Sequence, residues 1–244
     1  NYMTPSIGTS HSNEVILAIS GDTLFLDAPL TCAMTTDEAF VQVQTWPGRI
    51  AQSAVENMRL SSTYDIENPK DENHRWMAIV LDNGEDLWVR RVQFRHFAGS
   101  AVFVTDHVRR VTVEDCQSFA PVSEIGGSRR YTFHTMGGQC LFQRLYAEQG
   151  FHDFGTGRLA AGPNAFVQCQ ADWSHHMSGA IDAWATGLLF DGFNGEGVLL
   201  SFGNRGQDNM GAGWTAANSM MWNCSAAMLA NPTPPTANNW AYGA

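Results

Sequence analysis

One short phrase recurs along this chain, and that repeat limits the fold more than any other feature. Residues 89–97 (VRRVQFRHF) recur as 108–116 (VRRVTVEDC). The last six positions continue with looser similarity at 140–145, 164–169, 188–193 and 219–224. The third position of this six-residue phrase is always apolar, and its residues are Phe94, Val113, Phe142, Phe166, Phe190 and Met221. The sixth position is also apolar each time, with Phe97, Cys116, Leu145, Cys169, Phe193 and Cys224.

Short β-rich phrases at a period of about 20 to 30 residues favour an all-β solenoid, in which each repeat lies directly above the last. Strands of successive repeats would then lie ~4.8 Å apart, and equivalent residues would stack in rows. The spacing of three between the two apolar rows breaks strand alternation, so we expect each strand to bend into a turn after the phrase. A β-sandwich with turns every 8–12 residues is the alternative, but it does not explain why one phrase recurs in one phase.

The repeat divides the chain into three parts. Residues 1–75 form an irregular N-terminal β segment with the first coils. Within it, 15–27 reads as two strands around a Gly-Asp turn, 55–60 as an early coil and 61–75 as a polar loop. Residues 76–230 form the solenoid core. Residues 231–244 form a C-terminal tail, in which the proline-rich run 231–235 stops regular pairing.

Charge and cysteine content exclude several functional classes. The 14 Lys and Arg residues against 24 Asp and Glu residues give a net charge of -10, which argues against a nucleic-acid partner. No apolar run is long enough to form a transmembrane segment. The five cysteines cannot all pair, and their spacing fits no structural zinc site. Because Cys116, Cys169 and Cys224 fall in an apolar row, we expect them to be small buried core residues.

Together with these phrases, four glycine-rich segments carry a resemblance to a known family. They are 150–154 (GFHDF), 162–164 (GPN), 184–187 (WATG) and 211–218 (GAGWTAAN). The chain, over about residues 50–244, resembles the pectin-lyase-like right-handed parallel β-helix superfamily, and especially a bacterial branch of secreted, pectate-lyase-like proteins. The resemblance implies a right-handed parallel β-helix and an extracellular, periplasmic or cell-surface location. It implies no catalytic residues, because the arginine pattern of pectate lyases and the acidic motifs of polygalacturonases are not matched.

Loops that leave successive repeats at the same phase should emerge along one edge of the stack. The segments after the sixth phrase position are 117–139, 146–163, 170–187 and 194–218, and they hold many of the reactive side chains. Such loops would line a groove with arginine, histidine, carboxylates and tryptophan, which suits an extended sugar chain. The predicted substrate-binding residues are Arg129, Arg130, Arg158, His175, His176, Trp184, Arg205, Asp208 and Trp214.

The predicted catalytic residues are His152, Asp153, Asp182 and Glu148. His152 would act as a general base or acid with nearby carboxylates as partners; alternatively, it is a loop histidine bonded to a backbone carbonyl. His175 and His176 should point to opposite sides of an extended chain, so one of them is expected to be structural. A metal ion bound through one of these rings, with Asp182 or Asp172 nearby, is a weaker alternative. The arginines would hold a substrate carboxylate, or else pin loops.

The leading functional hypothesis is a secreted enzyme that cleaves a polysaccharide by β-elimination, with an acidic, uronate-containing polysaccharide as one candidate substrate. A glycoside hydrolase with two carboxylates is the second hypothesis, with Glu148, Asp153, Asp182 and Asp208 as candidates. A non-catalytic adhesin, glycan-binding or surface-assembly protein is the third. The sequence implies no particular cofactor; a divalent cation such as Ca²⁺ is the one candidate, since a cation could neutralise a uronate. A polysaccharide or oligosaccharide is the expected partner, and exposed solenoid ends would permit end-to-end self-association.

Overall fold

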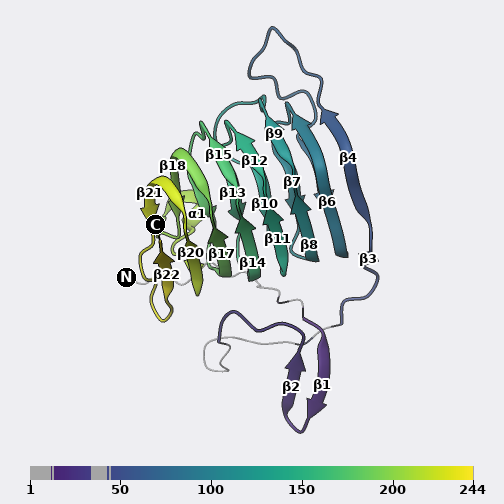
Figure 1. The fold of residues 1–244 in the computed structure, drawn as a ribbon, viewed down its shortest axis with the longest axis vertical. Coiled ribbons are helices and arrows are strands. Elements are labelled where there is room, and N and C mark those ends of the chain that lie inside the picture. Colours follow the sequence, from purple (N-terminus) through teal and green to yellow (C-terminus); the bar gives the residue numbers. More distant parts are fainter. Residues whose placement is uncertain (1–11, 13, 34–42, 44, 244) are drawn as a thin grey trace.

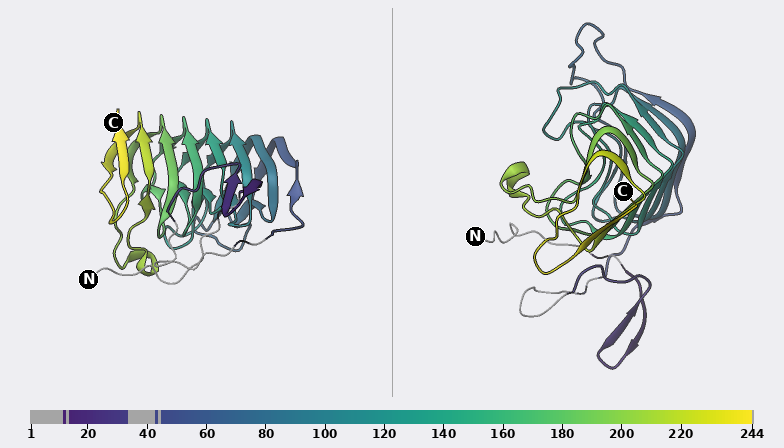
Figure 2. Two further views of the ribbon diagram at one scale, coloured as in Figure 1. Left: turned by 90° about the horizontal axis from the view of Figure 1, so that it is seen from below. Right: turned by 60° about the vertical axis from the view of Figure 1, so that its left-hand side comes forward.

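The computed structural model describes residues 12, 14–33, 43 and 45–243, and this part of the chain is nearly all-β. Most strands belong to one large sheet in which neighbouring strands run parallel. The prediction of an all-β protein with parallel strands is therefore confirmed. Figure 1 shows these strands side by side across the width of the view, and Figure 2 shows them from two further directions.

The parallel strands form three ladders, because each strand pairs with strands two or three places along the chain rather than with its neighbour in sequence. The first ladder contains β5 (Met77–Leu81), β7 (Ser100–Val104), β10 (Tyr131–Thr135), β13 (His152–Thr156), β16 (Ser178–Ala180) and the C-terminal parts of β18 (Asn194–Ser201) and β21 (Ser225–Ala230). Parallel strands need a crossover connection, and here the strands of the other two ladders provide it.

The second ladder contains β3 (Ile50–Ala51), β6 (Gly84–Arg95), β8 (Arg109–Glu114), β11 (Cys140–Gln143), β14 (Ala161–Val167), β17 (Ala185–Asp191), β19 (Ala216–Ala217), β20 (Ser219–Trp222) and β22 (Asn239–Tyr242). The third contains β9 (Gln117–Phe119), β12 (Tyr146–Glu148), β15 (Gln170–Asp172) and the N-terminal parts of β18 and β21. At one end, β4 (Ala54–Ser61) pairs with β6 over its whole length. One helical turn, α1 (Asp208–Gly211), lies between β18 and β19.

The bend predicted after each phrase is present and has a backbone cause. The residue that follows the phrase's fourth position adopts a positive φ in successive repeats; these residues are Asp115, Arg144, Gln168, Gly192 and Asn223. A left-handed residue turns the chain sharply, so the third and sixth positions can both face inward. The two apolar rows are therefore separated by a corner between the second and third ladders.

The first copy of the phrase was aligned wrongly by sequence. Val89, and not Phe94, pairs with Val113 in the ladder, whereas Phe94 pairs with Ser118 on β9. The left-handed residue of this repeat is Arg91, which interrupts the long strand β6. The similarity of the two VRRV segments therefore reflects sequence alone, because the hydrophobic pattern and the bend set a different register.

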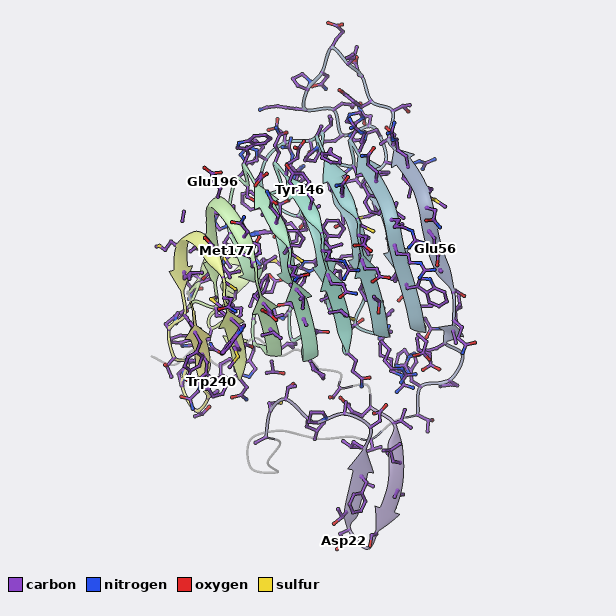
Figure 3. The ribbon with its side chains drawn as sticks, in the orientation of Figure 1. Asp22, Glu56, Tyr146, Met177, Glu196 and Trp240 are labelled. Carbon is purple, nitrogen blue, oxygen red and sulfur yellow. The ribbon has the colours of Figure 1, made fainter. Side chains whose placement is uncertain are left out.

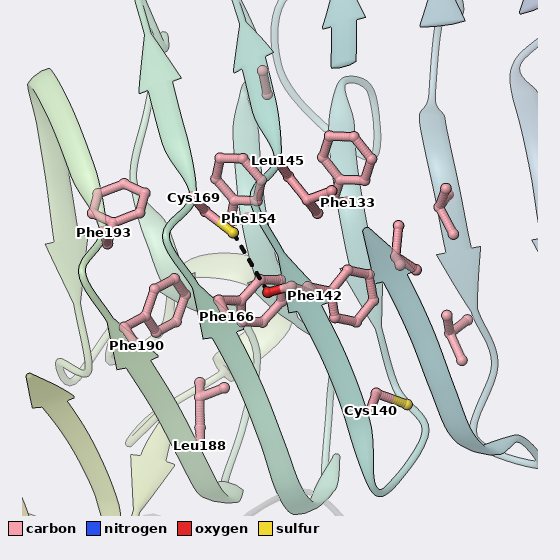
Figure 4. Packing of buried hydrophobic residues seen from close by; sticks show 14 of the residues in the cluster. Phe133, Cys140, Phe142, Leu145, Phe154, Phe166, Cys169, Leu188, Phe190 and Phe193 are labelled. Atoms are coloured by element: carbon pink, nitrogen blue, oxygen red, sulfur yellow. Dashed lines mark hydrogen bonds between the residues drawn. The ribbon is translucent and has the colours of Figure 1, made fainter. Parts of the chain in front are cut away.

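The interior is a stack of aromatic rings, shown in Figure 4. Phe142, Phe166 and Phe190 lie on successive strands of the second ladder, with ring centroids 4.7 and 4.8 Å apart. These distances match the spacing of neighbouring strands, so each ring stacks on the ring of the next repeat. All three rings are fully buried. The predicted internal row is confirmed from Val113 onward.

The predicted cysteine row is also confirmed. Cys116, Cys169 and Cys224 are buried, and each thiol lies near the carbonyl oxygen of the preceding repeat's third-position residue or, for Cys116, of Val89. All five cysteines of the chain are free thiols. These side chains therefore fill space in the core and form no disulfide.

The N-terminal strands β1 (Ile16–Ser20) and β2 (Thr23–Leu26) form a separate antiparallel hairpin, as predicted. Figure 3 shows Asp22 at its tip, away from the large sheet. Contacts of the following segment hold its base: Asp27 forms an ion pair with Arg110 at 3.6 Å, and the hydroxyls of Thr31 and Thr186 are 2.7 Å apart. At the other end, pairing stops at 231–238 but resumes in β22, so the tail predicted at 231–244 contains a strand of the sheet.

Candidate functional site

Several polar side chains gather at the first ladder. His134 on β10 pairs in register with Phe103 on β7, and their rings stack with centroids 5.5 Å apart. The next residue in this row is Gly155 on β13, and a Cβ there would clash with the side chain of Ile181. Gly157 likewise leaves room for Met136 and the His134 ring. The missing side chains of Gly155 and Gly157 therefore leave space in which Ile181, Met136 and the His134 ring lie directly over the strand.

His152 is the most informative residue of this region. Its side chain is buried, with only 1% of the residue exposed, and its Nδ1 lies 2.6 Å from the carbonyl oxygen of Met177, a residue labelled in Figure 3. A carbonyl oxygen only accepts hydrogen bonds, so Nδ1 carries the proton and Nε2 keeps its lone pair. Nε2 has no hydrogen-bond partner among the described residues, although it is buried. Burial lowers the pKa of His152 to about 3, so the ring is neutral at physiological pH.

Two further rings flank His152. Tyr131 meets it edge-on with centroids 4.7 Å apart, and His176 does so at 5.0 Å. His176 also stacks on Phe151 at 4.9 Å. Tyr131 is in addition 5.4 Å from His134, and burial raises its pKa. We call these four residues, Tyr131, His134, His152 and His176, the histidine cluster.

Charged groups from neighbouring turns surround the histidine cluster. The Arg205 Nη1 donates to the carbonyl oxygen of Ile181 at 2.8 Å, and its positive charge lowers the pKa of both His152 and His176. Burial raises the pKa of Asp182, whereas Arg205 and Arg158 oppose that shift. The carboxylate of Asp182 accepts a hydrogen bond from Asn209 in α1.

Asp208, at the start of α1, contributes a negative charge to the same neighbourhood and opposes the lowering of the His176 pKa. The predicted residues His152, His176, Asp182, Arg158, Arg205 and Asp208 are thus brought close enough to perturb one another electrostatically. They come from three segments of the sequence, 146–163, 170–187 and 194–218. The stacking of repeats is what makes them neighbours.

Asp153 takes a different position from the one expected for a partner of His152. It follows His152 on β13, and consecutive residues of a strand point to opposite faces. Its two carboxylate oxygens accept hydrogen bonds from the hydroxyls of Thr132, at 2.8 Å, and Ser174. Burial raises the pKa of Asp153 to about 6, against the effect of these two hydroxyls. Asp153 therefore links strand β10 to the loop that contains Ser174, and Met177 takes the place expected for a carboxylate partner of His152.

Three other predicted residues lie in separate contacts. Arg129 forms an ion pair with Glu72. Its guanidinium also lies over the ring of Trp76, with Cζ 5.4 Å from the ring centroid. Arg130 is buried and donates to the hydroxyl and carbonyl oxygens of Ser123 at 3.0 and 2.8 Å. Glu148 accepts from the backbone N–H of Ala120 at 3.1 Å. Both arginines therefore pin loops, which is the alternative that the sequence left open for them.

The remaining predicted residues lie at the margins. His175 and His176 are both exposed, and the backbone N–H of His175 donates to the carbonyl oxygen of Gly150. That these adjacent rings point to opposite sides of the chain stays a prediction. Trp184 and Trp214 are half-buried and lie on adjacent turns. The backbone N–H of Trp184 donates to the backbone carbonyl oxygen of Trp214 at 3.0 Å.

Tyr131 and His134 are not among the site residues that the sequence predicts. Both lie on β10, in register with β13, where Tyr131 pairs with His152. The signal was the spacing of Tyr131 and His152 by one repeat. The repeat pattern predicts a loop over 117–139, whereas 131–135 form a strand, so the sequence does not reveal this spacing.

One open hollow of the structure lies apart from the histidine cluster. An open hollow of about 760 Å³ lies over the second ladder, lined among others by Trp88, Arg90, Arg110 and Leu141. None of the residues that line it belongs to the histidine cluster. Within the described ranges, no group of three or more His, Cys, Asp or Glu side chains is arranged to hold a metal ion. The same part of the chain contains no helix long and apolar enough to cross a membrane.

Comparison with known proteins identifies no matching family model, no similar curated protein and no similar solved structure. The functional argument therefore depends on the geometry of the histidine cluster and its charged neighbours.

Proposed function

We propose that the three ladders form a right-handed parallel β-helix of the pectin-lyase-like type, and that the histidine cluster is its polysaccharide site. Pairing between strands two or three places apart along the chain supports a helical path of the chain. A right-handed path is supported by the strong preference of parallel crossover connections for that hand. On this fold, a groove across the first ladder would run along the stack and accept an extended sugar chain.

The proposed substrate is a uronate-containing polysaccharide, and the proposed reaction is β-elimination. The observation that carries the proposal is the neutral His152, whose buried Nε2 lone pair has no hydrogen-bond partner in the described part of the chain and lies in the field of Arg205. Leaving a buried polar atom unpaired costs about 1–3 kcal/mol, so a ligand group that satisfies it is favoured. A guanidinium has five N–H donors, which suit the planar carboxylate of a uronate.

The chemistry assigns one role to each group. Arg205, with Arg158 nearby, would bind the carboxylate and spread the charge that develops when the adjacent C5 loses its proton. His152 Nε2 would take that proton, and the C5–H electron pair would form the C4–C5 double bond. The C4–O4 bond would break, and the leaving oxygen would receive a proton from the Tyr131 hydroxyl. Bound uronate would also raise the pKa of His152 and make it a stronger base.

A glycoside hydrolase is the second candidate, and the state of Asp182 is the observation that favours it. A carboxyl group whose pKa is raised by burial is suited to be a general acid, and Asp208 would be the second carboxylate. The two reactions give different products. Elimination leaves an unsaturated, ultraviolet-absorbing sugar end, whereas hydrolysis leaves two saturated ends.

The test is incubation of the protein with a panel of uronate polysaccharides, such as polygalacturonate, alginate and glucuronan. We expect ultraviolet absorbance from unsaturated ends, and a loss of about 100-fold in kcat for Arg205→Ala and for His152→Asn. His175→Ala is the matched control and should retain the wild-type rate. New reducing ends without ultraviolet absorbance would favour the hydrolase. Binding of these polysaccharides without any product would favour the non-catalytic glycan-binding protein.

A further inference from the structure

The N-terminal hairpin exposes more apolar surface than a two-stranded element can support alone. Seven of its side chains and their immediate neighbours are large, apolar and exposed: Val15, Ile16, Leu17, Ile19, Leu24, Phe25 and Leu30. Leu17 and Ile19 are 66% and 68% exposed, and Phe25 is 52% exposed. An isolated two-stranded hairpin is at best marginally stable in water. Single exposed apolar residues are common, but seven within one short hairpin mark an interaction surface.

The outer edge of β1 is open for pairing. Among the described residues, β1 pairs with β2 and with no other strand. Its sequence, ILAIS, contains no charge, proline or glycine. Natural proteins usually protect an exposed sheet edge with charged residues, with proline or with a β-bulge that twists the edge strand away. The single irregularity of this hairpin lies between Ile16 and Ala18, and it leaves the rest of the strand regular.

Charge restricts what can cover this edge. The protein has a net charge of -10, whereas residues 15–26 contain one charged side chain, Asp22, at the tip of the turn. A second copy of the chain can therefore approach here with less repulsion than over most of its surface. An uncharged strand edge is also complementary to itself, which is what a twofold-symmetric contact requires.

We propose that the hairpin is a dimerisation arm, in which β1 of one copy pairs antiparallel with β1 of a second copy. The two hairpins would form a four-stranded sheet centred on Ala18, with Leu17 and Ile19 close to the twofold axis. The exposed apolar side chains amount to on the order of 500 Å² in each copy. Main-chain pairing along β1 adds to this area, so the interface approaches the ~800 Å² per partner of a standard specific complex.

The first test is the mass of the intact protein in solution, measured by light scattering or sedimentation over a range of concentrations. We expect a dimer for the wild type and an increase of about 100-fold in the dissociation constant for Ile19→Lys, because each dimer would bury two unpaired charges. Met228→Lys is the matched control. Met228 is 56% exposed on β21, at the end of the large sheet, and its substitution should leave the dimer intact.

A cross-link tests the geometry without relying on a destabilising change. In a Cys32→Ser background, we expect Ala18→Cys to form an intermolecular disulfide on mild oxidation, whereas Asp22→Cys at the hairpin tip should not. A wild-type protein that stays monomeric at all concentrations would overturn the proposal. A dimer that survives Ile19→Lys but dissociates with Met228→Lys would also overturn it, and would place the contact at the end of the large sheet.

Discussion

The aromatic stack of the second ladder and the histidine cluster at the first ladder differ in how their buried side chains find partners. In the interior, Phe166 stacks between Phe142 and Phe190, so each ring finds an equivalent ring in the next repeat. In the histidine cluster, buried Nε2 of His152 and Nδ1 of His134 have no partner among the described residues. The difference indicates that packing satisfies the rings of the interior, whereas the histidine cluster contains buried nitrogens at a cost of about 1–3 kcal/mol each in stability.

The same contrast appears within two consecutive residues of β13. Asp153 has both carboxylate oxygens bonded to hydroxyls, whereas His152 has one ring nitrogen bonded and one without a partner. Burial favours the neutral form of each group, so it raises the pKa of the acid and lowers that of the base. Asp153 and His152 should therefore make the stability of the protein depend on pH in opposite directions.

The largest expected effect comes from the interior. Phe166→Ala should lower the free energy of unfolding by about 3–5 kcal/mol, because it removes a fully buried ring and leaves a cavity between two others. Urea denaturation followed by circular dichroism measures this loss. Phe25→Ala, in the exposed hairpin, is the matched control and should cost less than about 1 kcal/mol. Equal losses for the two variants would contradict the assignment of the stabilising core to the stacked rings.

Asp153 should make the protein less stable as the pH rises. Its pKa is about 6 when folded and near 3.8 when unfolded, so the folded state holds the proton more tightly. This contribution is fully present below about pH 4 and is lost as the pH rises through 6, with a total of about 3 kcal/mol. Asp153→Asn should remove it. Unfolding free energies of both proteins between pH 4 and 7 test this, and a constant difference between them would contradict it.

His152 should have the opposite effect, with a smaller size over the accessible range. Its pKa is about 3 when folded and near 6.5 when unfolded, so its stabilising contribution is present above pH 6.5 and is lost as the pH falls. Between pH 7 and 5 the loss is about 2 kcal/mol. His152→Asn should lose correspondingly less stability than the wild type on acidification. If both proteins respond alike, the imidazole is charged or solvated in the folded state.

The cysteine row should give the smallest effect. Cys169→Ala should lower the free energy of unfolding by about 1 kcal/mol, because it removes one buried sulfur from the core. Cys32→Ala, at a half-buried position outside the row, should cost less. Thermal unfolding of the two variants measures the difference. A much larger loss for Cys169→Ala would show that its thiol does more than fill space.

The repeat allowed much of the fold to be predicted, because stacked apolar rows leave a periodic signal in the sequence. Val113, Phe142, Phe166 and Phe190 were placed correctly from that signal. Phe94 was not, because a left-handed residue inside a strand, here Arg91, leaves no reliable mark in the sequence. Register therefore had to come from the structure.

The site was predictable only in part. Stacking was expected to bring His152, Asp182 and Arg205 together, and the charge of Arg205 acts on the pKa of both His152 and Asp182. The partners of Arg129 and Arg130 could not be predicted, because Glu72 and Ser123 lie in irregular loops without a repeat. The role of Tyr131 depended on recognising 131–135 as a strand. Loop contacts depend on tertiary packing, which hydrophobic periodicity does not encode.

The central proposal is that His152 keeps its proton on Nδ1 and presents a neutral Nε2 lone pair to the C5–H of a uronate whose carboxylate binds Arg205. Nitrogen NMR of histidine side chains in the protein, with and without a uronate oligosaccharide, tests it most directly. We expect His152 to carry its proton on Nδ1 from pH 7 down to pH 5, and its Nε2 signal to shift when the oligosaccharide binds. A proton on Nε2, or bound oligosaccharide that leaves the His152 signals unchanged, would contradict the account.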